Sequence, residues 1–136
     1  MQAGGGLRPR VILADDSPAM IRVASRILGP HFDLLEAVAD GKSAVDAVLL
    51  HRPDVAVLDI LMPVLDGIQA TRKLVKQGAR ARIVVLSGLE EEQYVNAALE
   101  AGARAFVFKR RVNHDLAFAI NEVLQGRTFI SPERDS

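Results

Sequence analysis

The chain contains no cysteine, so it has no disulfide framework and no thiol chemistry, which fits a reducing compartment. Its 17 basic and 17 acidic residues cancel, so no overall charge attracts it to nucleic acid or to an anionic membrane. No apolar run approaches the roughly 18 residues of a membrane span, and the first residues lack an apolar signal core. We therefore expect a cytoplasmic protein without direct contacts to membrane or nucleic acid, in which any charge-based function is local.

The length of 136 residues is that of one domain, which can bury most of its surface around a single core. The glycine-rich start predicts a flexible N-terminal arm over residues 1–9. The folded domain is expected over residues 10–127, and residues 128–136 are expected to form a C-terminal tail, polar from Pro132 onward, or the start of a linker.

Short apolar runs alternate along the chain with stretches of helical periodicity. The run 55–58 leads directly into Asp59 and is too short for a helix, so it is typical of a strand buried on both faces. The run 32–39 contains acids and predicts an edge strand. Ser17 and Asn113 are predicted to cap the first and last helices. Five strands alternating with five helices predict an α/β domain with parallel strands and right-handed crossovers.

Polar residues follow four of the predicted strands, and the ends of parallel strands share one edge of a sheet. Asp15, Asp16 and Asp59 would repel one another there unless a cation lay among them, and oxygen ligands suit Mg²⁺ or Mn²⁺. Lys109 and Ser87 could meet phosphoryl oxygens at the same edge. Each residue alone has a simpler explanation as a cap, a turn or a solvated strand end. Together they favour phosphoryl transfer, with an aspartate as nucleophile and an acyl phosphate as its product.

Four short motifs lie at these strand ends: Asp15-Asp16, residues 59–63 (DILMP), Ser87-Gly88 and Lys109. A fifth, Gly102-Ala103, precedes the fifth predicted strand. On these motifs the chain resembles the receiver domain of two-component response regulators, from residue 10 to about residue 126. The resemblance implies a flavodoxin-like (βα)5 fold, a doubly wound parallel sheet with strand order 2-1-3-4-5.

By this resemblance Asp59 is the phosphoacceptor. It would take a phosphoryl group from a phosphohistidine on a sensor histidine kinase or a phosphotransfer protein. Asp16, Asp59 and the backbone carbonyl of Leu61 would bind Mg²⁺ or Mn²⁺, and Asp15 would hold the ion partly through water.

The resemblance also implies a switch. Ser87 would turn its hydroxyl to the phosphoryl oxygen, Lys109 would form an ion pair with it, and Phe106 would act as the aromatic switch residue. The simpler alternative for Phe106 is an ordinary core aromatic. Phosphorylation would change the surface formed by the fourth helix, the fifth strand and the fifth helix. A homodimer through the face of the fourth and fifth helices is a further expectation.

The chain departs from the family pattern at Arg110 and at Phe106, which lacks the hydroxyl that a tyrosine would use to bind a partner or a backbone carbonyl. Arg110 follows the lysine where many receivers have proline, often with a cis bond, which a non-proline residue disfavours. Leu61 and Leu89 flank the path of attacking water and cannot orient it by hydrogen bonding, so we expect a long-lived acyl phosphate. Residues 126–133 (GRTFISPE) are similar to receivers that precede a LuxR-type helix-turn-helix, which leaves open a stand-alone receiver or part of a longer regulator.

A signalling switch of this kind would have only self-phosphorylation and slow self-dephosphorylation chemistry. Two other function classes are alternatives to it. A Mg²⁺-dependent aspartyl-phosphate phosphatase would need a general acid two residues after its nucleophile, where this chain has Leu61. A flavin-binding electron carrier would need a phosphate-binding loop after the first strand, where this chain has two carboxylates.

Overall fold

The computed structural model describes residues 7–133, so most of the predicted N-terminal arm and the last three residues of the predicted tail lie outside it. The described residues form a parallel sheet in the order β2-β1-β3-β4-β5-β6. The α/β class and the strand order 2-1-3-4-5 are thereby confirmed. The strands are β1 Arg10–Ala14, β2 Asp33–Val38, β3 Val55–Leu58, β4 Arg82–Ser87, β5 Ala105–Phe108 and β6 Phe129–Ile130.

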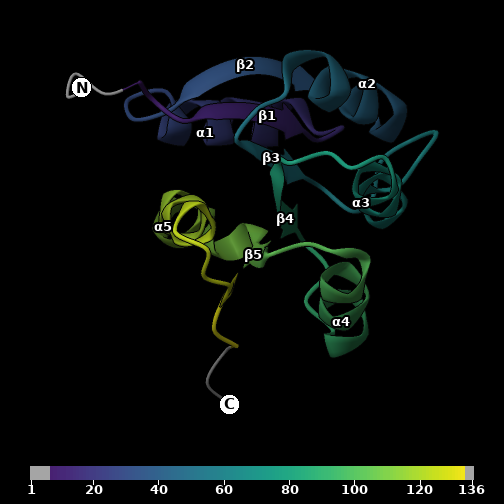
Figure 1. Ribbon diagram of the computed structural model, residues 1–136. Helices are drawn as coiled ribbons and strands as arrows, with labels where there is room; N and C mark the ends of the chain where they lie inside the picture. The colour runs from purple at the N-terminus through teal and green to yellow at the C-terminus, as the bar shows by residue number, and fades with distance from the viewer. Residues whose placement is uncertain (1–6, 134–136) are drawn as a thin grey trace.

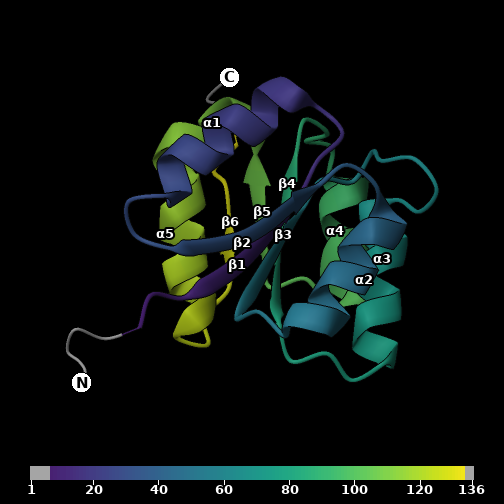
Figure 2. The same ribbon diagram turned by 90° about the horizontal axis from the view of Figure 1, so that it is seen from above.

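Helices cover both faces of the sheet. Figures 1 and 2 show α1 and α5 on one face and α2, α3 and α4 on the other. Alternate strand residues supply the two cores: Val11 and Leu13 pack toward α1 and α5, whereas Ile12 and Ala14 pack toward the other three helices. The helices are α1 Pro18–Leu28, α2 Gly41–His51, α3 Gly67–Lys76, α4 Glu92–Ala101 and α5 Val112–Leu124. None of the helices within residues 7–133 combines the length and the apolarity that a membrane crossing requires.

One of the two predicted helix caps is correct. The Ser17 side chain accepts a hydrogen bond from the Met20 amide at 3.2 Å at the start of α1. Asn113 is not a cap, because α5 begins one residue earlier at Val112 and its N-cap is Arg111. A short 3-10 helix, η1 (Lys109–Arg111), leads directly into α5. Because η1 precedes α5, the first turn of α5 is not a free helix end of the kind that a capping side chain stabilises.

The sheet has a sixth strand that the sequence did not predict. β6 lies parallel to β5, with Phe129 beside Ala105 and Ile130 beside Phe106. Ser131, which follows this strand, is only 2% exposed. The segment expected to be a C-terminal tail or the start of a linker therefore begins with residues that pack on the folded domain. A strand of two residues is too short to show an alternating pattern in a sequence.

The loop between β3 and α3 packs tightly against two helix starts. A Cβ atom on Gly41 would lie 1.8 Å from the Leu65 carbonyl oxygen, and one on Gly67 would lie 2.0 Å from the Asp59 carbonyl oxygen. Within this loop Val64 has a φ of 71°, in the left-handed region that is unfavourable for a β-branched residue. The loop that follows Asp59 therefore holds a strained residue.

Replacing Val64 with asparagine should raise the free energy of unfolding by about 1 kcal/mol, because asparagine tolerates the left-handed region better than valine. The Val64 side chain is 79% exposed, so little packing is lost. Urea unfolding measures the change. Leu50→Asn is the control, since Leu50 is 76% exposed within α2 and should give no gain. Equal or lower stability of the Val64 variant would show that the loop carries no such strain.

Candidate functional site

The three predicted acids meet at the carboxyl ends of two neighbouring strands. The Asp59 amide donates to the Ala14 carbonyl at 2.9 Å, which fixes the end of β3 beside the end of β1. One carboxylate oxygen from each of Asp15, Asp16 and Asp59 lies within 4.8 Å of the others. Asp15 and Asp59 are 1% and 5% exposed, whereas Asp16 is exposed. The cluster therefore has a buried floor and one side open to solvent.

Lys109 reaches this cluster from the end of β5. Its Nζ lies 2.9 Å from Asp15 Oδ2 and 3.1 Å from Asp59 Oδ2. Burial opposes the charge on Lys109, but its contacts with the carboxylates of Asp15 and Asp59 outweigh this effect and raise the pKa of the ammonium. The lysine is therefore charged and links two of the acids.

The Asp59 carboxyl group is hard to ionise in this surrounding. Burial and the neighbouring charge of Asp15 raise its pKa to about 6, against the lowering effects of Lys109 and of the Ile60 amide. That amide donates to Asp59 Oδ1 at 2.8 Å. Asp59 is thus ionised above neutral pH, at a cost that additional positive charge would relieve.

The donor set fits a hard divalent cation. Asp15 Oδ2 is buried and makes no hydrogen bond within residues 7–133; its contact with Lys109 Nζ is an ion pair without hydrogen-bond geometry. A single ammonium group balances only one of the three carboxylates. Carboxylate oxygens with an open side suit Mg²⁺ or Mn²⁺ rather than a softer metal. The Ile60 carbonyl already accepts a hydrogen bond from the Gly67 amide at 2.8 Å. The predicted metal ligand is the carbonyl of the next residue, Leu61.

Ser87 and Phe106 lie on the two strands beside the acids. Ser87, at the end of β4, is 1% exposed, and its Oγ accepts from the Leu89 amide at 3.0 Å. This leaves the hydroxyl proton available for a donor role. Phe106 is fully buried, and its ring meets that of Phe108 edge to face at 5.8 Å between centroids. Phe108 is the register partner of Ser87 on the neighbouring strand.

The arginines after Lys109 make contacts that sequence reasoning missed. The Lys109–Arg110 peptide bond is trans, as expected for a non-proline residue. Arg110 Nε donates to both Glu90 carboxylate oxygens, at 3.0 and 2.8 Å, and Arg111 Nε donates to Asp115 Oδ2 at 2.7 Å. The departure from proline at Arg110 was the one signal in the sequence that could have pointed to them.

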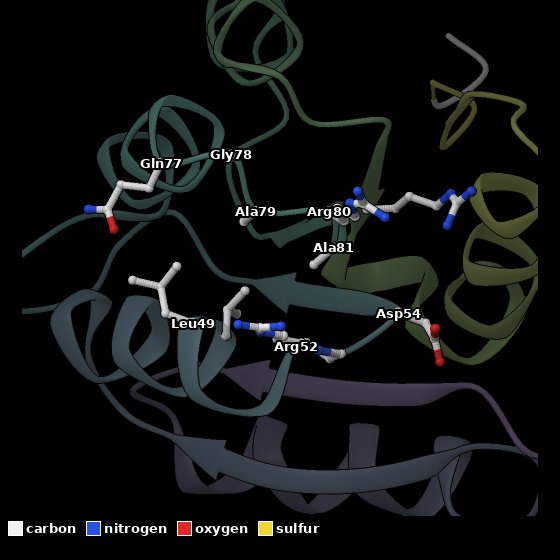
Figure 3. Close-up of a pocket in the computed structure, with 11 residues that line it drawn as sticks. Leu49, Arg52, Asp54, Gln77, Gly78, Ala79, Arg80 and Ala81 are labelled. Atoms are coloured by element: carbon white, nitrogen blue, oxygen red, sulfur yellow. The ribbon is translucent and has the colours of Figure 1, made fainter.

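A groove of about 770 Å³ lies at the opposite edge of the sheet. Figure 3 shows Leu49 and Arg52 on one side of it and Ala79 and Ala81 on the other. These residues belong to the end of α2 and to the loops that lead into β3 and β4, whereas Asp59 follows the carboxyl end of β3. The groove is therefore separate from the acidic cluster, which lies at the carboxyl ends of the strands.

Most of the chain matches a known protein family. The model of the response regulator receiver domain matches residues 11–121. The transcriptional regulatory protein DegU of Brevibacillus brevis is 32% identical over 126 residues, which are 91% of this chain and 53% of DegU. The chain thus spans about half the length of this curated relative.

Solved structures share the fold. The signal receiver domain of NarL from Mycobacterium tuberculosis has a TM-score of 0.86 at 28% identity, with 89% of this chain and 99% of that one covered. The Borrelia burgdorferi structure of CheX with CheY, BeF₃ and Mg²⁺ has a TM-score of 0.78 at 30% identity, with 90% and 91% covered. With its matching sheet order and its cluster of acids, this chain belongs to the receiver domains of two-component response regulators.

Proposed function

We propose that Asp59 accepts a phosphoryl group from a sensor histidine kinase or a phosphotransfer protein, and that this chain acts as a signalling switch. The observation that carries the proposal is the environment of the Asp59 carboxylate. It follows the carboxyl end of β3, it is 5% exposed, and it lies 3.1 Å from Lys109 Nζ. Receiver domains are signalling switches rather than turnover enzymes. They interact with such kinases and phosphotransfer proteins.

The proposed reaction moves one phosphoryl group. A carboxylate oxygen of Asp59 attacks phosphorus, the bond from phosphorus to the donor breaks, and the donor leaves with the electron pair. With a pKa of about 6, Asp59 is ionised above neutral pH and can act as the nucleophile. The Lys109 ammonium stays beside the acceptor and balances the incoming negative charge. The Ser87 hydroxyl donates to a phosphoryl oxygen.

Asp15, Asp16, Asp59 and the Leu61 carbonyl would hold Mg²⁺ or Mn²⁺ in the proposed site. A bound ion would supply positive charge next to the phosphoryl oxygens. The CheX–CheY structure, which contains Mg²⁺ and BeF₃, supports this assignment by likeness, and so does the buried Asp15 oxygen that makes no hydrogen bond within residues 7–133.

The proposed output is a changed surface over α4, β5 and α5. Inward movement of Ser87 would leave room for the Phe106 ring to rearrange beside Phe108. The face of α4 and α5 is proposed for a homodimer. DegU is named a transcriptional regulatory protein, and a role for this receiver in such a regulator is part of the proposal. That the chain itself contacts no nucleic acid stays a prediction.

Incubation with Mg²⁺ and acetyl phosphate, followed by intact-mass measurement, tests the proposal. The wild-type chain should gain the mass of one phosphoryl group, and Asp59→Asn should gain none. Asp46→Asn is the matched control, because Asp46 is an exposed acid on α2 that pairs only with Lys42 among the described residues. A phosphoryl group that persists in Asp59→Asn would overturn the assignment of the acceptor.

The acyl phosphate should decay slowly. Leu61 is 61% exposed and Leu89 is partly buried, and neither side chain can hold an attacking water by hydrogen bonding. Replacing Leu61 with asparagine should therefore speed the loss of the phosphoryl group by roughly tenfold. Mass spectrometry after removal of the donor measures the decay. Loss within seconds in the wild-type chain would contradict the prediction, and it would favour the phosphatase instead.

A further inference from the structure

Residues 129–132, which we call the C-terminal strap, lie against β5 outside the (βα)5 core. Figure 2 shows β6 beside β5 and α5. Beyond the strand pairing, the Ser131 amide donates to the Phe106 carbonyl at 2.9 Å, and the Phe129 ring meets Phe118 of α5 at 5.3 Å between centroids. The strap is therefore held along the strand that carries Phe106 and leads into Lys109.

The Ser131 hydroxyl joins the strap to both sides of the lysine. Its Oγ accepts from the Phe108 amide at 3.0 Å and donates to Asp115 Oδ2 at 2.8 Å. Asp115 also accepts from Arg111 Nε at 2.7 Å. Burial would raise the pKa of Asp115, but the hydrogen bonds from Arg111 and Ser131 outweigh burial and lower this pKa. Ser131 and Asp115 are 2% and 6% exposed. This buried chain of hydrogen bonds fixes the residue before Lys109 and the second residue after it.

Arg110 makes a second connection. Its Nη2 donates to the Pro132 carbonyl at 3.2 Å, while its Nε holds the Glu90 carboxylate. The guanidinium also lies over the Phe108 ring, 5.2 Å from the centroid. Glu90 belongs to the loop that leaves Ser87. The strap is thus tied to η1, which carries Lys109, and, through Arg110, to the loop that follows Ser87.

We propose that the C-terminal strap is a positioning element for Lys109 and that it sets the rate at which Asp59 is phosphorylated. Phe108, Arg110 and Arg111 are each bonded to the strap, directly or through Asp115, so the backbone that carries Lys109 is held on both sides. The ammonium group lies between two carboxylates at 2.9 and 3.1 Å, and a displacement of about 1 Å can slow a reaction by about a hundredfold. This proposal rests on the proposed function of Asp59.

The same coupling can be measured at equilibrium. If the attached strap strengthens the binding of a phosphoryl analogue at Asp59 through Lys109, the bound analogue must stabilise the attached strap by the same free energy. A partner that detaches residues 129–132 from β5 would slow phosphorylation without contact to Asp59.

The first test compares rates of phosphorylation by acetyl phosphate with Mg²⁺. Ser131→Ala removes the acceptor of the Phe108 amide and the donor to Asp115, and should slow the rate by about tenfold. Ser131→Thr keeps the hydroxyl and should restore it. Arg127→Gln is the control from the same stretch of chain. The Arg127 side chain bonds Glu122 of α5 and Gln125, which follows α5, and these bonds do not involve η1. Arg110→Gln is a second variant at the surface, should Ser131→Ala fold poorly.

A second readout separates this proposal from the proposed function. The Phe108 amide should exchange its hydrogen faster in Ser131→Ala, and the nuclear magnetic resonance signal of the Lys109 ammonium should shift, with no phosphoryl donor present. Both changes together with a slower reaction support the strap as a positioning element. An unmoved Lys109 signal or an unchanged rate overturns it. If the wild-type chain takes up no phosphoryl group, the proposed function fails, and the Lys109 signal alone decides whether the strap positions the lysine.

Discussion

Replacing Asp59 with asparagine is expected to stabilise the metal-free domain at and above neutral pH, although it removes the proposed phosphoacceptor. Burial and the charge of Asp15 raise the pKa of Asp59 from 3.8 to about 6, so the ionised carboxylate is less favourable in the folded chain than in the unfolded one. Asparagine keeps the shape and removes the charge. We expect a gain of about 1 to 2 kcal/mol after allowance for solvent screening, and a melting temperature several degrees higher.

The pH dependence has a definite sign. An acid with a raised pKa binds its proton more tightly in the folded state, so the folded domain gains stability as the pH falls from above 6 toward 4. The wild-type chain should therefore become more stable in this window through Asp59, and Asp59→Asn should lack that increment. Thermal unfolding in the presence of a chelator, followed at several pH values, measures both effects.

Two additions make this experiment decisive. Asp46→Asn removes an exposed acid of α2 and should change the melting temperature little. Mg²⁺ should stabilise the wild-type chain more than Asp59→Asn, since the variant lacks one of the three carboxylates. An asparagine variant that melts below the wild type in chelator would show that Lys109 already compensates for the charges around Asp59.

Replacing Gly67 with alanine is expected to destabilise the domain strongly. The added Cβ would lie 2.0 Å from the Asp59 carbonyl oxygen and 2.8 Å from its carbon, and both are backbone atoms that cannot move aside independently. The Gly67 amide also donates to the Ile60 carbonyl, which holds the two segments together. We expect a loss of about 3 kcal/mol and slower phosphorylation, because the clash pushes on the backbone that carries the nucleophile.

Urea unfolding and the acetyl phosphate assay measure the two losses. Gly88→Ala is the matched control, because nothing within residues 7–133, apart from its two chain neighbours, lies within 4 Å of a Cβ atom built on Gly88. Its stability should stay within about 0.5 kcal/mol of the wild type. A Gly67 variant as stable as the Gly88 variant would mean that the loop after β3 can shift without cost.

The sequence predicted the parts of this structure that rest on strong local patterns. Residues 55–58 form an unbroken apolar run, so the position of Asp59 at the end of a buried strand followed from hydrophobicity alone. The meeting of Asp15, Asp59 and Lys109 then followed from the shared edge of parallel strands. Strand order required the resemblance to a family, because nothing in one sequence says which strands are neighbours.

The parts that could not be predicted depend on contacts between distant residues. The Ser131 hydroxyl bonds the Phe108 amide across 23 positions, and Arg110 bonds Glu90 across 20. No periodicity signals either contact. Asn113 shows the opposite error, since a residue with a good capping side chain stands inside a helix that η1 already starts. Tertiary context decided all three.

The sheet order also determines how two copies of this chain can meet. An edge strand offers unpaired backbone groups to which another chain can add. One edge here is β6, only two residues long, and the other is β2, which carries Asp33 and Glu36. Short and charged edges both disfavour the addition of a strand. Self-association by a continued sheet, which leads toward aggregates, is therefore disfavoured, and we expect any specific pairing to use the helical faces.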